Sequence, residues 1–177
     1  MMFSLRVVAA CGLALLVSPV LLAAEIVHQA PAEFLEEQLP DCRPAALWLD
    51  RALRAEAEAL LERPYAGARV RYCEQDGRTA WILDEIGKTE PITTGVVIDG
   101  GRVEQVRVLV FRESRGGEVH RDAFTRQFRQ ATLDEHYRLD RTIDGITGAT
   151  LSVWALNRQV RLALLFDRAV RARRDDA

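Results

Sequence analysis

Two threonines and a serine stand in one short run of small residues, Asp144 to Ser152, which reads Asp-Gly-Ile-Thr-Gly-Ala-Thr-Leu-Ser. Asp144-Gly145 is typical of a tight turn, and the Gly-Ala pair that follows removes side-chain bulk. The apolar pattern from Leu151 to Val170 predicts a helix. Its first N–H groups would have no partner within the helix and would carry the positive end of its dipole. A helix start beside small residues lets a phosphate approach the backbone closely.

The same run has a simpler interpretation as a helix N-cap. A Ser or Thr before an apolar helix commonly accepts a hydrogen bond from a free N–H group and stabilises the helix by about 1 kcal/mol. The run is not a P-loop, because it lacks the Gly-x-x-x-x-Gly-Lys-Ser/Thr pattern and no lysine follows it. Spacing alone favours the cap and leaves a phosphate site as the alternative.

The run resembles the Asp-x-x-Thr/Ser-Gly-Ala-Thr-x-Ser/Thr signature of the FMN-binding domain family. This family includes the flavin-carrying subunits of the Na+-translocating NADH:quinone reductase and of the Rnf complex. In it, the last Thr of Gly-Ala-Thr carries FMN through a phosphoester bond, and a separate flavin transferase attaches the FMN from FAD. The resemblance implies that Thr150 is the attachment residue. The other positions that it implies for FMN binding are Asp144, Gly145, Ile146, Thr147, Gly148, Ala149 and Ser152.

The resemblance extends more weakly over residues 69–165, where the runs 77–83 and 111–116 are similar to small exported single-domain members. A flavin ring needs a flat apolar slot and a few hydrogen-bond partners. The aromatic candidates for the slot are Trp81, Phe124 and Phe128. The polar candidates for the ring are Glu113, Thr125 and Gln127. The cationic candidates for a flavin phosphate are Lys88, Arg112 and Arg115. The alternative without a flavin is that the aromatic residues belong to the hydrophobic core and the polar residues face water.

Other chemistries find little support in the residues. The three histidines, His28, His120 and His136, are scattered and have no cluster of carboxylates or cysteines around them, so we expect neither a metal site nor a catalytic dyad. No Gly-x-Ser-x-Gly elbow is present, and no Gly-x-Gly-x-x-Gly follows a strand. We therefore predict no catalytic residue, and the redox chemistry would belong to the cofactor.

The N-terminal residues are typical of an export signal. Arg6 is the only charge before Glu25, an apolar stretch follows it, and Ala23-Ala24 offers a cleavage site. We therefore expect a periplasmic protein, while an uncleaved anchor, which would make it membrane-associated, is the alternative. Cleavage would remove one of the 24 Lys+Arg residues and none of the 26 acids. The mature chain would be slightly acidic, which argues against a nucleic-acid partner.

Two cysteines, Cys42 and Cys73, would remain after cleavage. An oxidising compartment permits a disulfide between them, which would close a loop of about 30 residues. Two unpaired thiols are the alternative. Two cysteines without a nearby histidine would make a poor metal site.

The chain pattern predicts an α+β fold in which helices pack against an antiparallel sheet. The expected helices cover Pro31–Leu39, Ala45–Glu62, Asp122–Ala131 and Thr150–Arg173. The expected strands cover residues 70–73, 79–86, 92–98 and 102–111, with hairpin turns at Asp76-Gly77 and Asp99-Gly100-Gly101. The domain prediction is a signal peptide over 1–24, an N-terminal helical segment over 25–68 and an FMN-binding domain over 69–173.

These expectations combine into one functional hypothesis. The chain would be an exported electron-transfer flavoprotein that carries FMN on Thr150 and exchanges electrons with membrane or periplasmic redox proteins. Two alternatives remain open. One is a flavin-free assembly or scaffold factor for a membrane redox complex, and the other is a flavin reductase that acts on a soluble acceptor.

Overall fold

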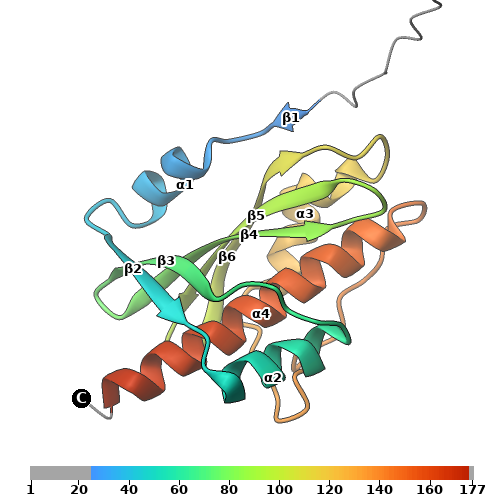
Figure 1. Ribbon diagram of the computed structural model, residues 1–177. Coiled ribbons are helices and arrows are strands. Elements are labelled where there is room, and N and C mark those ends of the chain that lie inside the picture. Colours follow the sequence, from blue (N-terminus) through green and yellow to red (C-terminus); the bar gives the residue numbers. More distant parts are fainter. Residues whose placement is uncertain (1–24, 176–177) are drawn as a thin grey trace, which may run out of the picture.

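The computed structural model describes residues 25–175, which form a six-stranded antiparallel sheet with helices on both faces (Figure 1). The strands lie in the order β1-β6-β5-β4-β3-β2. This architecture confirms the predicted α+β fold. The predicted signal peptide, residues 1–24, lies outside the described residues. Within the described residues, no helix combines the length and the apolar character that a bilayer crossing needs.

The centre of the sheet is a meander of four strands joined by short turns. These are β3 (Arg69–Gln75), β4 (Arg78–Ile86), β5 (Pro91–Asp99) and β6 (Arg102–Phe111). Both predicted hairpin turns are present. Asp76 and Gly77 have φ of 51° and 81°, and Gly100 and Gly101 have φ of 54° and 78°. Asp and Gly tolerate these left-handed conformations, which is why the sequence marks the turns so clearly.

The N-terminal part contains two helices, and it also adds both edge strands of the sheet. It contains β1 (Ile26–Val27), α1 (Pro31–Gln38), β2 (Arg43–Trp48) and α2 (Arg51–Leu61). β1 pairs with β6, and β2 pairs with β3. The helix predicted over Ala45–Glu62 is therefore two elements. Asp50 separates them, because its Oδ1 accepts a hydrogen bond from the Leu53 N–H at 2.9 Å and caps α2.

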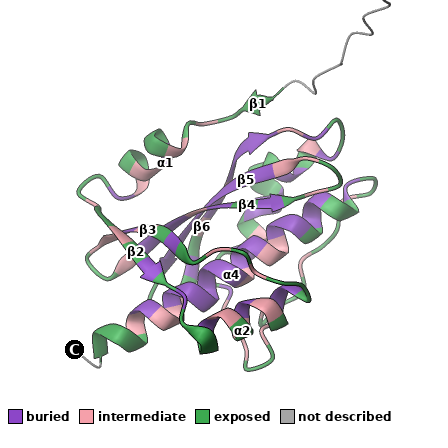
Figure 2. Cartoon of the chain, viewed as in Figure 1, coloured by how far each residue is buried: buried purple, intermediate pink, exposed green. Residues whose placement is uncertain are grey.

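The long helix α4 (Thr150–Asp175) crosses one face of the sheet, with α2 beside it (Figures 1 and 2). Alternate strand residues face opposite sides of a sheet. Trp81 and Val96 therefore join the large core under α4, whereas Ala80 and Val97 join a smaller core under α1. Figure 2 shows the buried side of α4 facing the strands along most of its length.

Two buried polar side chains of α4 bond to the sheet. Gln159, which has no exposed surface, donates from Nε2 to the carbonyls of Leu83 and Ile92 at 2.8 and 2.7 Å. Its Oε1 accepts a hydrogen bond from the Thr94 hydroxyl at 2.7 Å. Two turns further on, Asp167 accepts from the Thr79 hydroxyl at 2.7 Å. These directional bonds fix how far α4 can slide along the strands.

The connection from β6 to α4 differs from its prediction. The helix expected over Asp122–Ala131 is a short α3 (Asp122–Thr125) followed by a 3-10 turn, η2 (Arg126–Phe128). Gln130, at φ 63°, then ends any helical path. Phe124 and Phe128 still pack together edge to face, 5.8 Å between ring centroids. The apolar spacing was a correct signal of contact and a poor signal of helix length.

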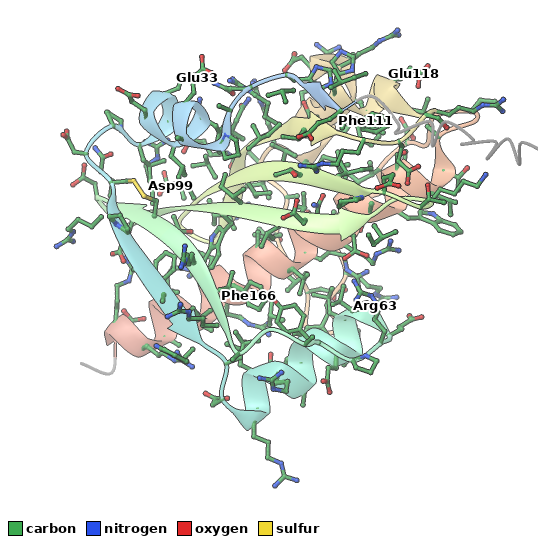
Figure 3. The ribbon with its side chains drawn as sticks, turned by 45° about the horizontal axis from the view of Figure 1, so that its top comes forward. Glu33, Arg63, Asp99, Phe111, Glu118 and Phe166 are labelled. Atoms are coloured by element: carbon green, nitrogen blue, oxygen red, sulfur yellow. A yellow bond between two sulfur atoms is a disulfide. The ribbon has the colours of Figure 1, made fainter. Side chains whose placement is uncertain are left out.

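Cys42 and Cys73 form a disulfide, so the paired alternative holds (Figure 3, yellow bond). The bond joins the loop after α1 to strand β3, with 5.4 Å between the two Cα atoms. It therefore ties the α1 segment to the sheet.

Candidate functional site

The motif residues 144–152 form the loop that enters α4. The Ala149 carbonyl accepts the first helical hydrogen bond from the Val153 N–H at 3.0 Å, and the Ala149 N–H donates to the Ile146 carbonyl at 2.9 Å. Thr150 is therefore the first residue of the helix and not its N-cap. Among residues 25–175, no group accepts a hydrogen bond from the N–H of residues 150–152.

The hydroxyls of the motif differ in their access to solvent. Thr147 and Thr150 are exposed, whereas Ser152 is 4 % exposed. Gly148 has φ of +82°, and a Cβ built there would meet no atom within 4 Å. The space beside the start of α4 is therefore open, and the Thr150 hydroxyl borders it.

The loop after β6 packs directly on the motif. Gly116 has φ of +84°, and a Cβ at this position would lie 2.6 Å from Ser152 Oγ and 3.3 Å from the Ala149 Cβ. Only glycine satisfies both the backbone conformation and this close approach. Gly116 is not among the site residues that the sequence predicts, although the Gly116-Gly117 pair is a local signal for a tight backbone.

A hollow of about 550 Å³ lies between this loop and the motif, and we call it the Lys88 hollow. The residues that line it are Lys88, Glu113, Ser114, Arg115, Gly148, Ala149, Thr150, Leu151 and Ser152. Lys88 and Arg115 give it two cationic side chains, and neither forms an ion pair within the described part of the chain. The third cationic candidate, Arg112, lies elsewhere. It donates to the Pro91 carbonyl and the Thr93 hydroxyl.

Glu113 lines the Lys88 hollow, but its carboxylate is committed to the turn between β4 and β5. It accepts hydrogen bonds from the backbone N–H groups of Lys88, Thr89 and Glu90, the last two at 2.7 and 2.9 Å. Burial alone would raise the pKa of Glu113, but these hydrogen bonds outweigh it and lower the pKa below its usual value. Glu113 thus fixes the backbone at Lys88 through Oε1, while its Oε2 accepts a hydrogen bond from the Thr89 hydroxyl at 3.2 Å.

The other predicted contacts separate into two groups. Gln127 lies near the motif, because its Oε1 accepts a hydrogen bond from the Asp144 N–H at 2.8 Å. By contrast, the side chains of Trp81, Phe124, Thr125 and Phe128 are buried away from the Lys88 hollow. Trp81 stacks on Tyr72 with 4.8 Å between ring centroids.

Comparison with known proteins identifies the segment that holds this site. Residues 87–165 match the family model of the FMN-binding domain. The match begins at the turn that Glu113 caps and ends within α4, so it covers every residue of the motif and of the Lys88 hollow. Neither the curated proteins nor the solved structures gave a significant match. Within residues 25–175, no three His, Cys, Asp or Glu side chains gather as a metal site would require.

Proposed function

We propose that this chain is a flavoprotein whose FMN is linked by a phosphoester to Thr150. The match of residues 87–165 to the FMN-binding domain supports flavin binding. The observation that carries the proposal is the position of the Thr150 hydroxyl. It is the exposed hydroxyl at the start of α4, and it borders the Lys88 hollow.

The residues present suit the phosphate end of FMN. The N–H groups of residues 150–152, which have no acceptor within the described residues 25–175, can donate to phosphate oxygens at the positive end of the α4 dipole. Lys88 and Arg115 can balance the remaining negative charge. Gly148 leaves space that a side chain would fill. When bound, FMN supplies one- and two-electron redox chemistry, and these residues hold and orient it.

The attachment would require a flavin transferase with FAD as the donor. Thr150 Oγ would bond to the FMN phosphorus as the P–O–P bond of FAD breaks. AMP would leave, and the hydroxyl proton would pass to a base of the transferase. The exposed Thr150 hydroxyl is accessible to such an enzyme, whereas the buried Ser152 hydroxyl is not.

We further propose that the protein is exported and transfers electrons between membrane or periplasmic redox partners. The N-terminal signal pattern supports export. A covalent bond suits that compartment, because a dissociated flavin would be lost by dilution beyond the cell. The Cys42–Cys73 disulfide is also typical of an oxidising compartment.

The test is the intact mass of the protein produced with a flavin transferase. We expect wild-type protein to gain the mass of one FMN less one water and to remain yellow after denaturation. Thr150→Ala should abolish both, and Thr147→Ala is the matched control that should keep them. A flavin that leaves on acid precipitation, or a modified peptide that maps to another residue, would refute the linkage. A colourless protein after coexpression would favour the assembly factor.

A further inference from the structure

A second hollow borders Thr150, and it shares only that residue with the Lys88 hollow. It has a volume of about 510 Å³, and we call it the Trp154 hollow. One wall is α4, from Thr150 to Arg161, and the other is the loop over residues 138–145. Its volume is typical of a site for a small ligand.

The apolar part of the lining suits a flat aromatic group. Leu139, Ile143 and Val153 lie beside Trp154 in this hollow. Trp154 is 55 % exposed, although it belongs to α4, whose other side contributes many buried residues to the core. An exposed indole beside aliphatic side chains offers a stacking surface for an aromatic ring.

The polar part of the lining is cationic. Arg138, Arg141 and Arg161 line the Trp154 hollow, and no acidic residue is among its described lining residues. Arg141 is engaged, because it donates to the carbonyls of Arg129 and Gln130. Arg161 donates from Nε to the Tyr137 carbonyl, and its two terminal nitrogens have no partner among residues 25–175. Arg138 forms an exposed pair with Asp134 at 3.4 Å.

Arg161 is the best placed of the three to bind an anion. Burial lowers its pKa, and Arg158 lowers it further, although Glu62 and Asp134 act in the opposite direction. A half-buried guanidinium with free N–H groups is stabilised by a carboxylate or sulfonate, which can take two parallel hydrogen bonds.

We propose that the Trp154 hollow binds a planar aromatic anion, whose ring stacks on Trp154 and whose carboxylate or sulfonate pairs with Arg161. This inference stands on residues outside the Lys88 hollow and does not depend on flavin attachment. Because Thr150 borders both hollows, the bound anion would lie beside the group that Thr150 carries. A redox-active anion of this class would then be close enough to exchange electrons with a flavin.

The test is a titration with 2-naphthoate that is monitored by calorimetry and by the indole N–H signals in NMR spectra. The full chain has three tryptophans, so the signals of Trp48, Trp81 and Trp154 can be separated by substitution. We expect saturable binding that moves the Trp154 signal. Neutral 2-naphthalenemethanol and the non-aromatic cyclohexanecarboxylate should each bind about tenfold more weakly or not at all.

Three variants and one matched control assign the contacts. Arg161→Met keeps the aliphatic stem, and it should weaken naphthoate binding about tenfold. Trp154→Ala should weaken it similarly, and Trp154→Phe should restore part of the affinity. Trp48 is the control, because it is 60 % exposed and also lies beside an arginine, Arg69. Trp48→Ala should leave binding unchanged.

Several outcomes would overturn the proposal. These are the absence of saturable binding, equal binding of the neutral analogue, or no effect of Arg161→Met in a variant with an unchanged spectrum. Binding to Thr150→Ala protein that is lost in flavin-carrying protein would show that the flavin ring itself fills the hollow. If Thr150 never carries FMN, the naphthoate titration would still give its expected result, so the two proposals can fail separately.

Discussion

Three glycines with nearly the same backbone conformation allow the packing around the motif to be measured. Gly77, Gly148 and Gly116 have φ of +81°, +82° and +84°. Gly77 lies in the β3–β4 hairpin, and a Cβ there or at Gly148 would meet nothing within 4 Å. Only at Gly116 would a Cβ collide with the motif. Alanine at the three positions therefore separates backbone strain from crowding.

The magnitudes follow from these surroundings. A left-handed alanine costs about 1–2 kcal/mol, and part of this cost is offset by the lower entropy of the unfolded chain. We expect Gly77→Ala and Gly148→Ala each to lower the free energy of unfolding by about 1 kcal/mol. At Gly116 the new Cβ would lie about 1 Å closer to Ser152 Oγ than an ordinary contact permits. Overpacking adds about 1–3 kcal/mol, so Gly116→Ala should cost about 2–4 kcal/mol.

The assay is equilibrium urea unfolding followed by far-UV circular dichroism, with the disulfide intact. Flavin occupancy by intact mass provides a second measurement on the same proteins. Gly77→Ala should keep full occupancy, whereas Gly148→Ala should lose part of it because its Cβ enters the Lys88 hollow. The double variant Gly116→Ala/Ser152→Ala should recover about 1 kcal/mol relative to the sum of the single effects, since it removes the closest colliding atom.

Equal losses of stability in Gly116→Ala and Gly77→Ala would refute the reasoning. They would mean that the loop after β6 does not rest on the motif. Full occupancy in Gly148→Ala would refute the role assigned to the open space beside Thr150.

Three further outcomes are expected. Glu113→Gln should unfold at a lower urea concentration than wild type at neutral pH. Folding lowers the pKa of Glu113 below its usual value of 4.5. The stability advantage of the wild type should therefore fade as the pH falls below 4.5 and through the folded-state pKa. A constant difference in urea midpoint across that range would contradict the assigned hydrogen bonds. Reducing the Cys42–Cys73 disulfide, which spans 31 residues, should lower the free energy of unfolding by about 4 kcal/mol and leave flavin occupancy unchanged; a loss under about 1 kcal/mol would count against it. Trp81→Phe should destabilise the core by removing the 2.9 Å bond from Nε1 to the Thr79 hydroxyl, and the flavin absorption spectrum should not move, whereas a shifted spectrum would bring the indole back into the cofactor site.

The features that the sequence predicts best depend on neighbours along the chain. Both hairpin turns follow from Asp-Gly and Gly-Gly pairs, and the start of α4 follows from the change from small residues to an apolar helical pattern. The sequence does not separate strand β2 from α2, because Leu49 and Leu53 have the i, i+4 spacing of a helix. The i, i+2 spacing of Leu47 and Leu49 is typical of a strand. Asp50, in the cap position before Leu53, was the local signal that separated the two elements.

The features that the sequence does not predict depend on contacts across the fold. Glu113 lies 23 to 25 residues after the N–H groups that it caps, so no local pattern indicates its role. The same holds at position 116, where a larger residue would collide with Ser152 from a distant segment. Trp81 has the residue type of a flavin contact, but its place on the strand directs it into the core under α4.

The buried bonds of Gln159 and Asp167 give α4 a single admissible register on the sheet. Aliphatic contacts alone would tolerate a shift by one turn, about 5.4 Å, because one leucine can replace another. After such a shift, the Gln159 amide would leave the carbonyls of Leu83 and Ile92 without their partner inside the core. Thr150 would then be displaced from Lys88 by the same distance. If FMN is attached at Thr150, only chains in which α4 has docked in this register would acquire it. The attached flavin would then report that the helix has folded correctly.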